Sequence, residues 1–351
     1  VINAYMDEET KSSLKTEIIK ILDTGSYYYT GGRNALIKGI FNFMFGYGAL
    51  QRYVDDDDVS DIDGTAYNQF SITKNGVRQS VDIDFGDEDS FGTYCRLIAV
   101  RSGGILNEDD THCRTADLSR KLRINVSIPP RNVSGPAISI RKHRKKAYAF
   151  DDLVKLGMMD NGVAELLRKT AGSSESLLIS GKGASGKTTL MRTLINSLPE
   201  LERVLVVESD AEIYPEKRFC IEQRIKRASE GGQPVTLEML VRDGLTMSLD
   251  AYCIGEIVGE EAYSFIKASC SGHRVLGTIH SGNAAGTLPR LVSLASGSRG
   301  AEPAGMLMRH AISGISTIVH MERFRVVHIL RVKGIDGDKP AYEELYRRKA
   351  S

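Results

Sequence analysis

The segment 181–189 could carry phosphate chemistry, because it reads Gly-Lys-Gly-Ala-Ser-Gly-Lys-Thr-Thr and completes the pattern G-x-x-x-x-G-K-[ST]. In such a loop the glycines let backbone N–H groups turn towards a β-phosphate, the lysine reaches the β- and γ-phosphate oxygens, and the next hydroxyl binds Mg²⁺. The sequence therefore predicts a nucleoside triphosphate site with Mg²⁺, in which Lys187 is also catalytic. We assign to it Gly181, Gly183, Ala184, Ser185, Gly186, Lys187, Thr188 and Thr189, with Thr188 as a metal ligand.

A residue that polarises the attacking water belongs at the carboxyl end of a neighbouring strand. The apolar run 251–254 predicts such a strand, Gly255 allows the backbone to approach closely, and Glu256 follows. A single glutamate after a strand is ordinarily a surface residue, but the phosphate loop in the same core reverses that expectation. We therefore interpret Glu256 as the catalytic residue that orients water.

More carboxylates follow the predicted strand 203–207, which leads to Glu208, Asp210 and Glu212. Like charges this close repel each other unless a cation neutralises them. Bound Mg²⁺ would do so, directly or through water. We assign Glu208 and Glu212 to catalysis and Glu208 to the metal as well, and the alternative is a solvated acidic loop.

Two histidines flank the predicted strand 274–279. Seven extended residues at about 3.3 Å each separate His273 from His280 by roughly 20 Å. The two cannot share a metal, which argues against a zinc site formed with Cys270. His280 follows the strand on the side of the phosphate loop, and we interpret it as a catalytic residue that reports the γ-phosphate. For His273 a packing role and a functional role both stay open.

Composition limits the classes of function. The 351 residues suit two domains, and 46 Lys plus Arg against 45 Asp plus Glu give no global basic field for nucleic acid or an anionic membrane. The five cysteines never form C-x-x-C, which argues against a disulfide framework and indicates a reducing compartment. We find no apolar run for a spanning helix and no export leader, so we expect a soluble protein. The chain opens on Val1 rather than Met, which is compatible with missing natural N-terminal sequence.

The sequence pattern predicts an N-terminal α+β domain with leading helices over 1–140, a linker over 141–150 and a nucleotide-binding domain over 151–351. Helices are expected at 7–23, 35–45 and 93–100, antiparallel strands within 59–81, and strands at 122–128 and 137–140. The basic run 141–146 opens the linker. Nucleic-acid binding by that run is the minor alternative, because no aromatic stacking platform accompanies it.

The second domain alternates strands with helices. A helix is expected at 151–170 and strands at 177–180, 203–207, 251–254 and 274–279. Such alternation predicts an α/β fold with a mostly parallel sheet and helices on both faces. Segments 317–321 and 325–332 are expected as antiparallel additions to this sheet.

The ordered series of phosphate loop, Glu208 and Glu212, Gly255-Glu256 and the histidine segment 271–280 resembles the secretion-superfamily traffic ATPases. These enzymes power type II and type IV secretion, conjugation and pilus assembly. The resemblance is closest to the tight-adherence (Flp) pilus-assembly ATPases and their conjugation relatives. It covers most of the chain, since further matching blocks lie at 45–50, 58–62, 123–125, 129–130 and 135–141.

This resemblance implies a RecA-like P-loop ATPase core in a homo-hexameric ring, with ATP and Mg²⁺ as cofactors. It makes 181–188 the Walker A loop, 208–212 an Asp box, Glu256 the Walker B glutamate and His280 a His box. Arg123, Arg141 and Arg224 match arginines that reach the phosphates, where guanidinium groups neutralise transferring charge. The implied partner is the inner-membrane platform protein of a pilus or secretion machine, with the ATPase cytoplasmic and peripheral to the membrane. No direct nucleic-acid binding is expected.

The chain lacks one acidic residue and several basic residues of the family pattern. Ser209 stands where the family has aspartate, 257–259 reads Ile-Val-Gly where an arginine is usual, and Thr246 and Ser248 replace expected arginines. Taken with the matching motifs above, the sequence predicts Mg²⁺-dependent ATP hydrolysis that powers pilus assembly or protein secretion. The alternatives are a nucleotide-gated assembly module with little hydrolysis, a conjugative DNA-transfer ATPase, or a helicase-like motor. The last would need stacking aromatics, and the ATPase half has no tryptophan and few tyrosines or phenylalanines.

Overall fold

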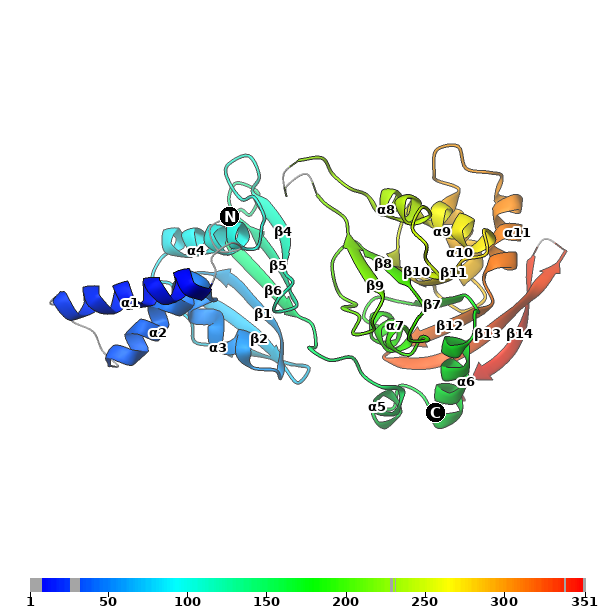
Figure 1. Ribbon diagram of the computed structural model, residues 1–351, viewed down its shortest axis with the longest axis horizontal. Helices are drawn as coiled ribbons and strands as arrows, with labels where there is room; N and C mark the ends of the chain where they lie inside the picture. The colour runs from blue at the N-terminus through cyan, green and yellow to red at the C-terminus, as the bar shows by residue number, and fades with distance from the viewer. Residues whose placement is uncertain (1–7, 26–31, 228–229, 231, 338, 350–351) are drawn as a thin grey trace. The chain divides into compact units, whose positions relative to one another are not determined.

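The computed structural model describes residues 8–25, 32–227, 230, 232–337 and 339–349 (Figure 1). The chain forms two compact units. The first holds the residues up to Arg144 together with Arg227–Gln233, and the second holds Lys145–Lys226 together with Pro234–Ser351. None of the described helices combines the length and the apolar character that a membrane crossing requires.

The first unit is an antiparallel sheet packed against a helix. Its described residues form six strands in the order β3-β2-β1-β6-β5-β4. Phe91 and Ile98 of α4 share one core with Ile62, Ile124 and Ile140 of the sheet. The elements are α1 (Glu8–Thr24), α2 (Arg33–Phe45), a 3-10 turn (Gly48–Leu50), α3 (Gln51–Asp55), β1 (Val59–Ala66), β2 (Gln69–Lys74), β3 (Val77–Val81), α4 (Glu88–Arg101), β4 (His112–Asp117), β5 (Leu122–Ser127) and β6 (Ala137–Lys142).

The predicted helices at 35–45 and 93–100 and the antiparallel strands within 59–81 are confirmed, and so is the helix predicted at 7–23 over its described residues. Strand β4 was not predicted. Its buried residues Cys113 and Thr115 alternate with polar ones, but only two positions of the strand are fully buried, too few for a clear period of two.

The strand predicted to end at residue 140 continues through Lys142, so the linker assignment of Arg141 and Lys142 is wrong. Arg141 pairs with Arg123 across the β5–β6 ladder and donates from Nε to Asp61 of β1 at 2.9 Å. Lys142 Nζ donates to the main-chain oxygen of Tyr53 at 2.9 Å. These tertiary partners hold two basic residues in the sheet, where their charge alone suggested an exposed connection.

The second unit is built on a mostly parallel sheet, as predicted. Its described residues form eight strands in the order β14-β13-β12-β7-β11-β10-β8-β9. The ladders from β12 through β9 are parallel, whereas β13 and β14 are added antiparallel. The strands are β7 (Leu177–Gly181), β8 (Val204–Glu208), β9 (Cys220–Arg224), β10 (Ala251–Ile257), β11 (Arg274–Ile279), β12 (Thr317–Glu322), β13 (Arg325–Asp336) and β14 (Lys339–Arg347). The antiparallel prediction is confirmed for β13 but wrong for β12, which is parallel to β7.

Helices cover both faces of this sheet because alternate strand residues feed two separate cores. Leu178 and Ile254 lie in a core with Phe265 of α9, whereas Ile179 and Cys253 lie in a core with Met191 of α7. Every residue of β7, β8 and β11 is buried, as expected for strands covered on both faces. The helices are α5 (Phe150–Lys155), α6 (Asn161–Gly172), α7 (Lys187–Asn196), α8 (Leu237–Gly244), α9 (Glu261–Cys270), α10 (Thr287–Ala295) and α11 (Ala304–Gly314).

The single helix predicted over 151–170 is wrong, because α5 and α6 are separate. The chain turns at Gly157, whose φ of 75° suits glycine. A new N-terminus then forms at Asp160, whose carboxylate accepts the Val163 N–H at 2.9 Å. The apolar residues on either side share one core, which masked the interruption in the sequence pattern.

Candidate active site

Four parallel strands bring the predicted catalytic residues to one edge of the sheet, called here the carboxyl edge. The ladders keep β7, β11, β10 and β8 in register, so that their carboxyl ends lie together. This is the edge at which open α/β sheets bind ligands. The loop 181–187 follows β7, Glu256 lies near the end of β10, Glu208 ends β8 and His280 follows β11.

The phosphate loop needs glycine at its two ends. Gly181 has a φ of 153°, and a Cβ atom there would lie 2.3 Å from the main-chain oxygen of Met321. Gly186 has a φ of 95° and caps α7, and a Cβ atom there would lie 2.9 Å from the Phe324 ring. The loop therefore has a fixed curvature at the start of α7, where helix N–H groups and the helix dipole favour an anion.

Lys187 is buried inside this curve. Its ammonium group donates to the main-chain oxygens of Gly181 at 3.3 Å and Lys182 at 3.0 Å. Burial lowers the pKa of Lys187, and the carboxylates of Glu256 and Glu212 oppose that shift. The hydroxyl of Ser185 is buried in the same loop with no hydrogen-bond partner among the described residues. A buried cation and an unsatisfied donor fit the phosphates of a nucleotide.

Glu256 and His280 contact each other directly. The distance from His280 Nε2 to Glu256 Oε1 is 2.7 Å, and both side chains are about half exposed, at 47% and 49%. The His280 ring also lies against the loop, because a Cβ atom on Gly183 would be 3.7 Å from its Cε1. The arrangement places a carboxylate and an imidazole together beside the phosphate loop.

Glu208 is buried at the end of β8 and accepts the N–H groups of Glu212 and Ile213 at 3.1–3.3 Å. Burial raises the pKa of Glu208 to about 8, although these two hydrogen bonds oppose the shift. Gly255 makes room for it, since a Cβ atom there would lie 2.7 Å from Glu208 Cγ. Burial therefore disfavours the charged form of Glu208 in this acidic segment. Among the described residues, no three His, Cys, Asp or Glu side chains are arranged to hold a metal.

The three predicted arginines occupy two places. Arg224 ends β9, directly opposite Glu208 in the β8–β9 ladder, and donates to the main-chain oxygen of Ile225 at 3.2 Å. Arg123 and Arg141 are cross-strand partners in the sheet of the first unit. The structure of the second unit therefore brings Arg224 to the carboxyl edge.

The turn between β12 and β13 supports the phosphate loop, and sequence reasoning missed it. Phe324 N–H donates to the main-chain oxygen of Ser185 at 3.1 Å. Buried His320 hydrogen-bonds through Nδ1 to the hydroxyl of Ser180, one residue before the loop, at 2.9 Å. Burial lowers the pKa of His320, which keeps the imidazole neutral. A histidine inside the apolar run 317–321 was the available signal.

Comparisons with known proteins agree with this geometry. The family described as type II/IV secretion system protein matches residues 109–321. A Mycobacterium tuberculosis (strain H37Rv) protein named for conjugal transfer is 25% identical over 88% of this chain and 95% of its own length. Protein VirB11 of Agrobacterium fabrum is 31% identical over 63% of this chain and 73% of its own length. The crystal structure of the pilus retraction motor PilT with bound ADP covers 83% of this chain and 80% of its own, with 18% identity and a TM-score of 0.56.

Proposed function

Because this chain belongs to the type II/IV secretion system protein family and is an ATPase with a RecA-like P-loop core, we propose that it couples Mg²⁺-dependent ATP hydrolysis to pilus assembly or protein secretion. The working form is a homo-hexameric ring beside the cytoplasmic membrane. Its partner is a membrane platform protein of the secretion or pilus machine. Membership of the family supports this assignment.

The contact between Glu256 and His280 at the phosphate loop is the observation that carries the proposal. Lys187 and the loop N–H groups neutralise charge on the transferring phosphoryl group, and Glu256 orients the attacking water. His280 is placed to exchange its bond with Glu256 for one with a γ-phosphate oxygen, which frees the carboxylate. When bound at Thr188, Mg²⁺ supplies further charge neutralisation at the phosphate oxygens. Protonated Glu208 is a poor metal ligand, so its part in metal binding requires deprotonation.

Replacement of Glu256 by glutamine tests the assignment. Glutamine keeps the size but loses the charge, so we expect ATP turnover to fall about 10²–10⁴-fold while nucleotide still binds. Glu260→Gln is the matched control, because Glu260 is an exposed carboxylate four residues further on. Turnover by the purified Glu256→Gln protein at the wild-type rate would contradict the proposed role.

A second candidate is a nucleotide-gated assembly module with little hydrolysis. It is favoured by Thr246 and Ser248 and by the Ile-Val-Gly sequence at 257–259, where the family pattern supplies cations. Turnover measured together with nucleotide-dependent ring formation separates the two. Ring formation with ATP but turnover no faster than that of Glu256→Gln would select this candidate.

A conjugative DNA-transfer role for the same ATPase is favoured by the Mycobacterium tuberculosis relative, whose name assigns it to conjugal transfer. The two roles differ in their cargo, so copurification with a pilin or with a DNA-processing partner distinguishes them. The assignment of Arg123 and Arg141 to the nucleotide phosphates also stays a prediction. Charge-reversed variants at these positions, assayed for ATP turnover, test it.

A further inference from the structure

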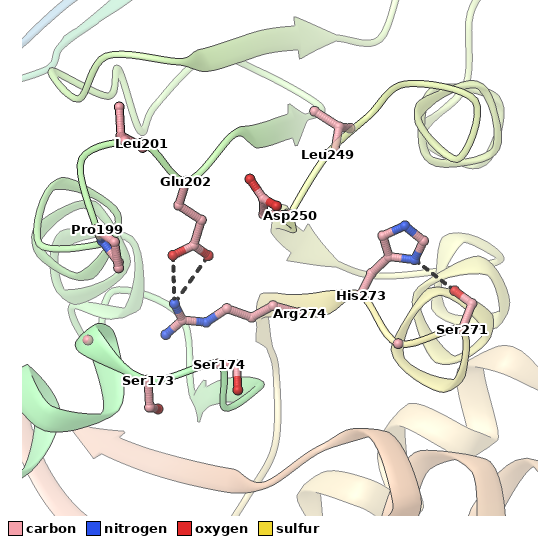
Figure 2. Close-up of a pocket in the computed structure, with 12 residues that line it drawn as sticks. Ser173, Ser174, Pro199, Leu201, Glu202, Leu249, Asp250, Ser271, His273 and Arg274 are labelled. Atoms are coloured by element: carbon pink, nitrogen blue, oxygen red, sulfur yellow. Dashed lines mark hydrogen bonds and ion pairs between the residues drawn. The ribbon is translucent and has the colours of Figure 1, made fainter.

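A cavity of about 680 Å³ lies at the opposite edge of the second unit's sheet, called here the amino edge (Figure 2). Its size is that of a small-molecule site. Four turns line it, and each leads into one parallel strand: 172–174 towards β7, 199–202 towards β8, 249–250 into β10 and 271–274 into β11. None of these residues belongs to the nucleotide site.

The floor of the cavity is a neutral pair. The Arg274 guanidinium donates to both carboxylate oxygens of Glu202 at 3.1 and 3.2 Å, and these side chains are only 4% and 11% exposed. The same guanidinium donates to the main-chain oxygens of Thr170 at 2.7 Å, Ala171 at 3.1 Å and Glu175 at 3.0 Å. Figure 2 shows the two side chains facing each other across the cavity floor. Since its donors are turned to the protein, Arg274 offers little to an anion.

The other polar side chains present acceptors. Ser271 Oγ lies 2.9 Å from the main-chain oxygen of Ala268 and 2.8 Å from His273 Nδ1. When the Ser271 hydroxyl donates to Ala268, the imidazole N–H is the donor in the second contact. In the neutral ring this leaves His273 Nε2 with a free lone pair. Asp250 is exposed, accepts only the Arg203 N–H at 2.8 Å, and has no ion-pair partner within the described part of the chain.

The backbone adds negative potential to that of Asp250. Helix α9 ends at Cys270, so its carboxyl end lies at the cavity wall, whereas the last carbonyls of α6, at Thr170 and Ala171, already accept from the Arg274 guanidinium. Such ends carry partial negative charge and favour cations. Pro199 and Leu201, which is 77% exposed, form an apolar wall of the cavity. The cavity thus combines an acceptor-rich, negative wall with an apolar one.

We propose that this cavity binds an organic cation, an ammonium or guanidinium group carried on a short apolar chain. The N–H groups of the cation bond to the Asp250 carboxylate and to His273 Nε2, and the chain lies on Leu201. The same chemistry occurs in a free diamine or guanidine and in a basic side chain of a partner protein. The site is independent of the proposed ATP hydrolysis, since no residue is shared.

Titration calorimetry of the full chain with agmatine, which has a guanidinium and an ammonium group on four carbons, tests the site. We expect Asp250→Asn to weaken binding about tenfold or more, because a charge-assisted hydrogen bond is lost. Asparagine keeps the acceptor for the Arg203 N–H, so we expect the backbone before β10 to keep its conformation. Glu200→Gln is the matched control, since Glu200 lies in the same turn as Leu201, is 73% exposed and does not line the cavity.

Several results would overturn the proposal: no heat with millimolar agmatine, equal weakening in the two variants, or tighter binding of succinate than of agmatine. A second titration uses a short arginine peptide and the same peptide with glutamine. Tighter binding of the arginine peptide than of agmatine identifies a partner side chain as the ligand, and the reverse order identifies a free amine. Either order of affinity supports the site, provided that Asp250→Asn weakens the binding of both ligands. Unchanged thermal midpoints show that the variants are folded.

Discussion

The two edges of the sheet in the second unit are formed by the same strands, but the buried cations at the two edges have different partners. At the amino edge the buried cation Arg274 is paired with the Glu202 carboxylate and bonded to three main-chain oxygens. At the carboxyl edge the buried cation Lys187 has two main-chain contacts inside a glycine loop, and Glu256 and His280 stay half exposed. A buried cation that a carboxylate neutralises supports the fold, whereas a buried cation bonded only to main-chain oxygens keeps its charge for a phosphate. The comparison shows that the carboxylate partner makes the difference, because glycine turns occur at both edges.

The largest expected effect on stability is at the amino edge. Arg274→Met leaves the buried carboxylate of Glu202 unpaired, so we expect a loss of about 3–5 kcal/mol in the free energy of unfolding. Urea denaturation measures it, and Arg218→Met, at an 81% exposed arginine, is the control. Nucleotide affinity of the folded protein should stay unchanged. A loss no greater than that of Arg218→Met would mean that the pair is structurally neutral.

A smaller effect is expected from a methyl group in the phosphate loop. Gly181→Ala places Cβ against the Met321 oxygen at a φ of 153°, and we expect it to cost about 1–3 kcal/mol and to weaken nucleotide binding. Gly183→Ala is the matched variant, because its nearest contact would be an ordinary 3.7 Å. Fluorescent-nucleotide titration measures both. Equal affinities for the two alanine variants would show that the loop adapts and would weaken the contrast between the edges.

A third prediction concerns the pH dependence of stability. The pKa of Glu208 is raised from 4.5 to about 8, so between these values the folded state holds a proton that the unfolded state has lost. Stability therefore falls as pH rises through this window, and the fall ends above the folded pKa. Glu208→Gln keeps an acceptor for the Glu212 and Ile213 N–H groups, and we expect a flatter profile from pH 5 to 8.

Thermal midpoints across that range measure the profile. Glu238→Gln is the control, because Glu238 is an exposed carboxylate in the first turn of α8. A wild-type profile in Glu208→Gln would mean that Glu208 is ionised in the folded protein. In that case it would be available to a metal at neutral pH, and the carboxyl edge would carry more charge than the structure indicates.

The sequence predicted the elements that follow local rules. The phosphate loop is contiguous, and the mostly apolar runs before Gly181, Glu208 and His280 are buried strands as expected. The extension of β6 was missed because it depends on a distant partner, the contact of Arg141 with Asp61. The restart of α6 at Asp160 is a local cap, and it was missed because the apolar residues on either side form one continuous pattern. The role assigned to each predicted site residue stays a prediction.

By itself the sequence determined the chemical groups and the order in which they follow the strands, because a phosphate loop and a buried strand are each formed by consecutive residues. Only the tertiary structure decided which groups meet and in what state of charge. The pairing of Glu256 with His280, the hydrogen bonds to buried Glu208 and those of Arg274 join residues between 4 and more than 100 positions apart. Parallel strands connected by helices bring such residues together, and the low polarity of the core then sets their protonation.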